Sequence, residues 1–147
     1  THEPTTEQRE LAKKLASWGA DVIIGTHPHV IQPVEYIENS DGRRTLVAYS
    51  LGNFISAQNR GPRMLGGMIN FDIVKNNNTG KVAIENVVFS GVVTHYGYNA
   101  SNVRIYPLAD YTEELASKHG VKSKTPDFSL QYLNNIMNEV IDKQFLK

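Results

Sequence analysis

The stretch Val22-Ile23-Ile24-Gly25-Thr26-His27-Pro28-His29-Val30-Ile31 (residues 22–31) predicts a strand that ends in a loop with two histidines. A near-continuous aliphatic run is typical of a strand that is covered on both faces. Residues i and i+2 of an extended chain point to the same side, so His27 and His29 can direct both imidazoles into one pocket. Imidazole is the commonest side-chain metal ligand, and Pro28 restricts the backbone between the rings. We therefore interpret His27 and His29 as a metal-binding pair; the alternative is a loop that carries two histidines by chance.

An amphipathic helix is predicted immediately before this strand. Thr5 and Gln8 have the spacing of a capping box, and Gly19 is suited to follow the helix end. Three apolar residues recur at i, i+4 and i+7 and are expected in the core: Leu11, Leu15 and Trp18. Helix, glycine turn, strand and polar loop form half of an α/β unit, in which ligands collect at the carboxyl ends of strands. The histidine pair occupies that position.

Two antiparallel hairpins and a further strand are predicted after the histidine loop. Their strands are expected at residues 34–38 with 45–50, at residues 68–74 with 82–89 (continuing to about residue 96), and at residues 103–106. Asn53 follows the first hairpin and offers an acceptor as well as donors, so it could orient a phosphate or a metal-bound water. The alternative, which the pattern alone favours, is an asparagine that caps its own turn.

The C-terminal third is predicted to be helical. One helix is expected over residues 108–119, with Leu108, Tyr111 and Leu115 turned inward, and another from Pro126. The second helix carries one apolar stripe: Leu133, Ile136, Met137, Val140 and Ile141. His95 lies beside two tyrosines and is predicted to be a packing or surface residue.

The composition excludes several classes of protein. The 147 residues suffice for one domain, and 15 basic residues balance 15 acidic ones, so we expect no nucleic-acid partner. No apolar run is long enough to cross a bilayer. Because the sequence contains no cysteine, a metal site would use His, Asp, Glu or Asn.

Two motifs resemble those of a known family. Residues 19–35, GADVIIGTHPHVIQPVE, resemble the signature of the bacterial CapA proteins of capsule and poly-γ-glutamate synthesis, and residues 49–54, YSLGNF, resemble that family's second signature. The likeness extends over residues 4–108. It implies that residues 1–147 are the C-terminal part of a single CapA-like domain, with residues 1–108 best matched and residues 109–147 a helical C-terminal segment.

The resemblance also implies a fold and a site. The fold is that of the calcineurin-like metallophosphoesterases, an α/β (α+β-like) arrangement of sheet layers flanked by helices. Gly25, His27 and His29 match the Gly-x-His-x-His segment that supplies metal ligands in that superfamily, with Asn53 as a catalytic residue nearby. The superfamily holds two divalent ions, which here would be Mn, Zn, Fe or Mg. Its other ligand-bearing elements are missing from this sequence, which looks like a cut through a longer protein, so we expect residues 1–147 alone to be inactive.

The function implied is capsule or poly-γ-glutamate biosynthesis through a metal-dependent hydrolase site that acts on an anionic polymer or a phosphoester. The alternative is a non-catalytic component of a capsule polymer assembly or export complex, with other proteins of that complex as partners. The resemblance places the full-length protein outside the cytoplasm and in association with a membrane. A sheet that lacks its first half would expose an edge, and a homodimer of this chain is therefore expected.

Overall fold

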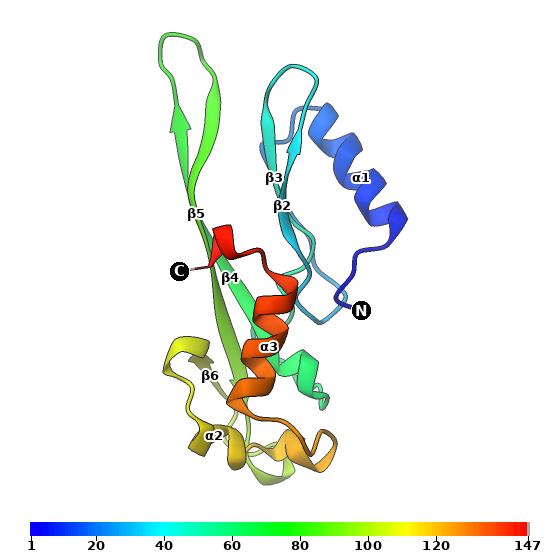
Figure 1. Cartoon of the computed structure of the whole chain (residues 1–147), viewed down its shortest axis with the longest axis vertical. Coiled ribbons are helices and arrows are strands. Elements are labelled where there is room, and N and C mark those ends of the chain that lie inside the picture. The colour runs from blue at the N-terminus through cyan, green and yellow to red at the C-terminus, as the bar shows by residue number, and fades with distance from the viewer. Residues whose placement is uncertain (147) are drawn as a thin grey trace.

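The computed structural model describes residues 1–146, which form two three-stranded sheets around a shared core. The first sheet has the order β1 (Val22–Ile24), β3 (Arg44–Ala48), β2 (Val34–Glu38), with β1 parallel and β2 antiparallel to β3. The second is antiparallel and has the order β4 (Leu65–Lys75), β5 (Val82–His95), β6 (Arg104–Pro107). The β2–β3 and β4–β5 hairpins point in the same direction (Figure 1). The two predicted hairpins are therefore confirmed.

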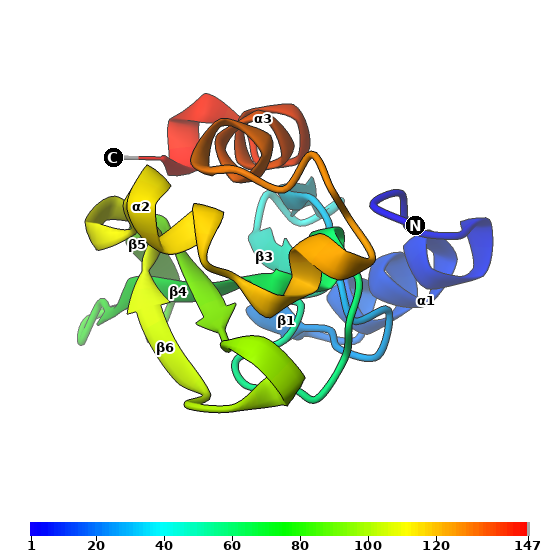
Figure 2. The same cartoon turned by 90° about the horizontal axis from the view of Figure 1, so that it is seen from below.

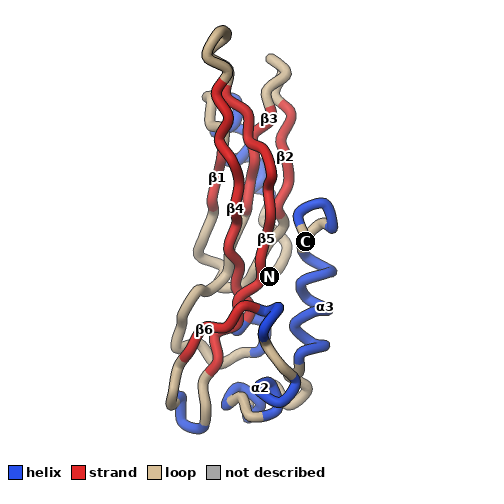
Figure 3. The backbone as a smooth tube through the Cα atoms, turned by 90° about the vertical axis from the view of Figure 1, so that its left-hand side faces the viewer, coloured by secondary structure: helices blue, strands red, loops and turns tan. Residues whose placement is uncertain are grey.

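Three α-helices flank the sheets: α1 (Thr6–Ser17), α2 (Glu113–Ser117) and α3 (Leu130–Val140). α1 covers the outer side of the first sheet, and α3 lies on another side of the molecule (Figures 1 and 2). The strands run along the long axis, with α2 near one end (Figure 3). This arrangement confirms the predicted α/β class. No helix within residues 1–146 has the length and apolar character needed to cross a membrane.

β3 is the strand that holds the layers together. Leu46, Val47 and Ala48 are all fully buried although they are consecutive. Leu46 and Ala48 belong to the main core, which includes Phe89 of β5, whereas Val47 packs with Ala12 of α1 on the opposite face. Since neighbouring residues of a strand point to opposite faces, three consecutive buried residues require cover on both sides.

The prediction that the first strand is buried was wrong. β1 pairs with β3 along one edge only, and it forms the outer edge of its sheet. Val22 and Ile23 are half-buried, and Ile24 is 43% exposed. The doubly covered strand is β3, which lies at the centre of the sheet.

The predicted core stripe of α1 was also wrong, although its capping box between Thr5 and Gln8 is present. Leu11 is 54% exposed and Trp18 is 75% exposed, and Leu15 is only half-buried. The buried residues of α1 are instead small: Ala12 and Ala16. The alanines face the sheet, and the larger side chains lie on a part of the helix that the described residues leave uncovered.

The two C-terminal helices differ from their predicted bounds. The region 108–119 consists of a 3-10 turn at Leu108–Asp110 followed by the short α2, because Thr112 is extended and caps a new helix through Leu115 N–H. α3 begins at Leu130 and not near Pro126, since the Ser129 hydroxyl accepts from Tyr132 N–H and caps it there. The hydroxyl caps thus set both helix starts.

His119 is the most buried titratable side chain of the C-terminal region. It is 2% exposed, its Nε2 donates to the Thr94 carbonyl at 2.9 Å, and its Nδ1 accepts from Val121 N–H at 2.9 Å. His95 packs against its ring at 4.8 Å and contacts Tyr111 Oη at 2.8 Å, in agreement with its predicted packing role. Burial lowers the pKa of His119 to about 4, because the charged ring would lose its hydration.

This histidine predicts an acid-dependent loss of stability. Between pH 6.5 and 4 the unfolded chain binds a proton at His119 that the folded chain does not, so the free energy of unfolding falls as the pH falls. The full effect is about 3 kcal/mol, because each tenfold change in proton affinity corresponds to about 1.4 kcal/mol. Urea unfolding across this pH window measures it. His119→Gln should be less stable at neutral pH but should lose this part of the pH dependence, and an unchanged slope would contradict the assignment.

Apolar side chains are exposed on both faces of the sheet beside the open edge of β1. Leu11 of α1 lies on the face that carries Ile23, whereas Ile24 lies on the opposite face, near Phe54 and Met68. Ala12 and Ile23 share one small core cluster, so the middle of α1 packs over the middle of β1. If two copies of the chain paired their β1 edges in antiparallel orientation, their two α1 helices would lie antiparallel on the same face of the joined sheet. The first half of α1 carries Glu7, Arg9 and Glu10 and the second half carries Lys13 and Lys14, so the two halves have net charges of opposite sign, and these would face each other.

We therefore expect the isolated chain to form a homodimer through the β1 edge. Sedimentation equilibrium measures the mass. Ile24→Lys should give a monomer. Ile73→Lys, at an exposed apolar position on β4, is the matched control and should remain dimeric. A monomer at all accessible concentrations would contradict the expectation.

Candidate functional site

His27 and His29 lie in the loop that follows β1, at the carboxyl end of that strand. Their ring centroids are 6.1 Å apart, the planes are inclined by 44°, and both side chains are exposed. The structure thus brings together the two residues that the sequence singled out.

The backbone conformation that brings the two rings together differs from the predicted one. An extended chain was predicted, but His27 has φ 101° and His29 has φ 62°. Positive φ is unfavourable for residues other than glycine and costs on the order of 1–3 kcal/mol per residue. The two rings therefore come together through two left-handed residues around Pro28, and not through strand alternation. Strain of this kind is concentrated at functional sites in proteins.

Asn53 fixes the orientation of the His29 ring. Its Nδ2 donates to the Arg63 carbonyl at 3.1 Å and lies 3.4 Å from the His29 carbonyl, so its Oδ1 must face the imidazole. His29 Nδ1 lies 2.8 Å from that Oδ1 and is the donor. The proton on Nδ1 leaves Nε2 with a free lone pair that points away from Asn53. Asn53 is 7% exposed and acts on the site through His29, whereas the sequence pattern favoured a simple turn cap.

Two glycines permit the close approach of the chain segments that frame this site. A Cβ on Gly25 would lie 2.1 Å from the Tyr49 carbonyl oxygen, and a Cβ on Gly66 would lie 1.9 Å from the Asn53 carbonyl oxygen. Neither Gly66 nor the Arg63 carbonyl was predicted from the sequence to be part of the site. The Gly66-Gly67 pair at the start of β4 was the available signal, because adjacent glycines in a strand often mark a close backbone approach.

Two further motif residues, Gln32 and Glu35, stabilise the surroundings of the loop. Gln32 is 2% exposed, and its Nε2 donates to the carbonyls of Thr1 and Glu3 at 3.0 and 3.2 Å. Glu35 accepts a hydrogen bond from Tyr49 Oη at 2.8 Å. This carboxylate and the burial of the ring raise the pKa of Tyr49 to about 12, burial being the larger cause. Within residues 1–146, both side chains hold the chain around the loop without a hydrogen bond to the histidine pair.

The described residues do not complete a metal site by themselves. Within residues 1–146 no group of three or more His, Asp or Glu side chains is arranged to hold a metal ion. Catalytic zinc sites use three protein ligands. The two histidines supply two, and Asn53 Oδ1 is occupied by His29.

Comparison with known proteins identifies the segment that carries this loop. Residues 1–58 match the family described as bacterial capsule synthesis protein PGA_cap. These residues are thus similar to that family. His27, His29 and Asn53 all lie within the matched residues, and the resemblance to CapA proteins predicted from the sequence is confirmed.

Two relatives share part of the chain. The PGA biosynthesis protein CapA of Bacillus subtilis (strain 168) is 34% identical over 83 residues, which cover 56% of this chain and 20% of the relative. The capsule biosynthesis protein CapA of Bacillus anthracis is 39% identical over 57 residues, which cover 39% of this chain and 13% of the relative. The matched part thus spans at most a fifth of these relatives. No solved structure matches the chain. The proposed domain bounds, with likeness to residue 108, stay a prediction.

The geometry around Asn53 predicts a specific tautomer. In ¹H–¹⁵N correlation spectra of the imidazoles, His29 should carry its proton on Nδ1 at neutral pH. Asn53→Ala should abolish this preference and, by leaving the Arg63 carbonyl without its donor, lower stability by about 1–3 kcal/mol. Asn39→Ala is the matched control, because Asn39 also makes a side-chain hydrogen bond, to Thr45, but at the far end of β3. A His29 spectrum that is identical in wild type and Asn53→Ala would refute this role.

Proposed function

We propose that the protein acts in bacterial capsule or poly-γ-glutamate biosynthesis, and that His27 and His29 are two ligands of a metallophosphoesterase-like, divalent-metal hydrolase site. The names of the two Bacillus relatives support the biosynthetic role. The single observation that carries the chemical proposal is the strained histidine pair, in which Asn53 leaves Nε2 of His29 free for a ligand. The substrate class is an anionic polymer or a phosphoester.

The chain's own contribution to such a site is to present and orient donors. Asn53 holds one imidazole in a single tautomer, and the two positive-φ residues keep the rings 6.1 Å apart before any ion arrives. Two imidazoles held in this way lose little conformational entropy when they bind an ion. The remaining ligands of one or two Mn, Zn, Fe or Mg ions must come from outside residues 1–146, because these residues supply only two. Capsule polymer lies at the cell envelope, so we place the full-length protein outside the cytoplasm in association with the membrane.

A second function is a non-catalytic role in a capsule polymer assembly or export complex. A substituted ligand set in the part of the protein outside residues 1–146 would favour it. In this case other proteins of the complex are the partners, and the fold is retained for contacts.

Metal binding at the pair separates the two proposals. Titration with paramagnetic Mn²⁺ should broaden the imidazole signals of His27 and His29 before those of the other three histidines, His2, His95 and His119. Calorimetry with Zn²⁺ should show weak binding that is lost in either His27→Ala or His29→Ala, because a single imidazole remains. His2→Ala is the control and should bind as the wild type does. Equal broadening of all five histidines, or binding that survives both substitutions, would refute the metal site and favour the assembly role.

A further inference from the structure

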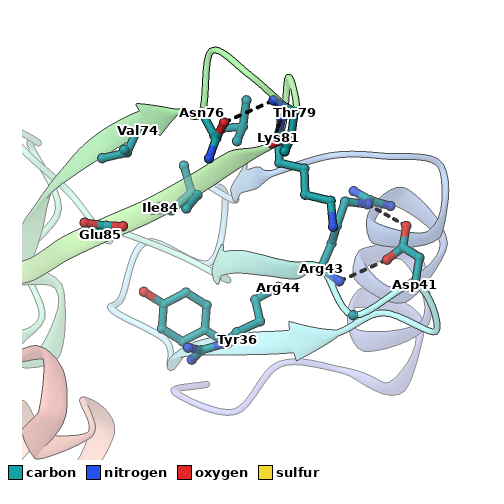
Figure 4. A pocket seen from close by; sticks show the side chains of 13 residues that line it. Tyr36, Asp41, Arg43, Arg44, Val74, Asn76, Thr79, Lys81, Ile84 and Glu85 are labelled. Atoms are coloured by element: carbon teal, nitrogen blue, oxygen red, sulfur yellow. Dashed lines mark hydrogen bonds and ion pairs between the residues drawn. The ribbon is translucent and has the colours of Figure 1, made fainter.

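The two ends of β3 differ in how their charged and polar groups are used. Beyond its first residue, a cleft of about 920 Å³ lies between the tips of the β2–β3 and β4–β5 hairpins (Figure 4). Both arginines of this cleft are paired, Arg43 with Asp41 and Asp21, and Arg44 with Glu38. Its other two charged residues, a lysine and a glutamate, have opposite signs. The cleft therefore selects no charged ligand, and the contacts that bear on the proposed site lie at the histidine end.

At that end, Asn53 is held by the chain that follows it. The 3-10 turn η1 (Gly61–Met64) presents the Arg63 carbonyl to Asn53 Nδ2 at 3.1 Å. The other side of the same amide, Oδ1, then faces His29 Nδ1 at 2.8 Å. A displacement of η1 would withdraw the carbonyl and free the amide to rotate. The orientation of the His29 ring thus depends on the position of η1.

η1 is anchored to the C-terminal region (residues 109–146). Gly61 N–H donates to Thr125 Oγ1 at 3.0 Å, across 64 residues of sequence. A Cβ on Gly61 would lie 2.7 Å from Thr125 Cγ2 and 3.0 Å from Tyr132 Oη, so the two segments approach as closely as a glycine permits. At the other end of the turn, Met64 is fully buried in the same core as Phe128. The C-terminal region therefore fixes both ends of η1.

The Thr125 hydroxyl serves as the N-cap of this turn. The first N–H groups of a helix have no acceptor within it. Arg60, the residue before η1, makes no side-chain cap, and Pro62 has no N–H. The buried Gly61 N–H takes its acceptor from Thr125 instead. Without that hydroxyl a buried donor would lack a partner, so the start of η1 would shift toward water.

A second pair of hydrogen bonds links the C-terminal region to the residue after Asn53. The Phe54 carbonyl accepts from Thr94 Oγ1 at 3.1 Å, and the Thr94 carbonyl accepts from His119 Nε2 at 2.9 Å. Thr94 and His119 are both buried, so water cannot readily replace these bonds. The side chain of Asn53 and the backbone beside it are thus both supported from residues 119–125.

We propose that the C-terminal region positions the histidine pair, and that Thr125 is a positioning residue for it. Thr125 acts through Gly61 and η1 on Asn53, and Asn53 acts on His29. The family match covers residues 1–58 and so does not include Thr125. The effect on metal binding rests on the proposed function, whereas the effect on ring orientation does not.

The test is the substitution of Thr125, with His29 followed in ¹H–¹⁵N correlation spectra of the imidazoles. Thr125→Val keeps the shape of the side chain but removes the acceptor, so the preference of His29 for a proton on Nδ1 should weaken. The Zn²⁺ affinity of the pair, measured by calorimetry, should fall about tenfold, at the lower end of what loss of a histidine's hydrogen-bonding partner costs. Thr125→Ser keeps the hydroxyl and should behave as the wild type does.

Thr112→Val is the matched control. The Thr112 hydroxyl also accepts a backbone N–H in the C-terminal region, from Leu115, but it caps α2. This variant should lose stability in urea unfolding and leave the His29 spectrum unchanged. Gly61→Ala reaches the proposed contact from its other side, because the added methyl group displaces Thr125, and it should alter His29 as Thr125→Val does. Circular dichroism checks that each variant is folded.

The outcomes distinguish this proposal from the proposed function. An unchanged His29 spectrum in Thr125→Val and Gly61→Ala, or an equal change in Thr112→Val, overturns the positioning role. If the wild type binds no Zn²⁺, the metal site fails, while a His29 spectrum that responds to Thr125→Val and not to Thr112→Val still supports the positioning role.

Discussion

The burial of β3 on both faces is the constraint on which the rest of the structure depends. Leu46, Val47 and Ala48 are consecutive residues and all are fully buried. α1 therefore covers one face of the strand, while the second sheet and α3 cover the other. Because β3 is fixed between two layers, both of its ends are fixed as well. The histidine loop lies at one end and the cleft between the hairpins at the other. One strand thus positions two chemically different surfaces.

At the histidine end, packing energy offsets local strain. His27 and His29 adopt positive φ values, a cost of the order of a few kcal/mol in total. The hydrogen bonds of Asn53 to His29 and to the Arg63 carbonyl, together with the buried Ile31, hold the loop in that conformation. A loop without these contacts would relax, and the rings would separate. The proposed ligand binding rests on this strain and on the contacts that maintain it.

The sequence predicted the elements whose signals are local and missed those that depend on tertiary packing. The capping box at Thr5, the two hairpins and the histidine pair could be predicted, because turn and cap chemistry acts over a few residues. The burial of Ala12 and Ala16 in place of Leu11 and Trp18 could not be predicted from the sequence, since hydrophobicity alone does not show which face of a helix meets a sheet. The Asn53–His29 bond was likewise hidden, because 24 residues separate the partners.

The incomplete ligand set and the exposed edge of β1 have one physical origin. A strand with a single neighbour leaves its other edge open. In the proposed metal site the further donors would come from outside residues 1–146, and a strand paired with β1 would bring them to this edge. Exposed apolar side chains, Leu11 on one face and Ile24 on the other, lie beside that same edge. A segment that covered this surface by pairing with β1 would carry its own strand ends to the histidine pair, so closure of the fold and completion of the site would be one event.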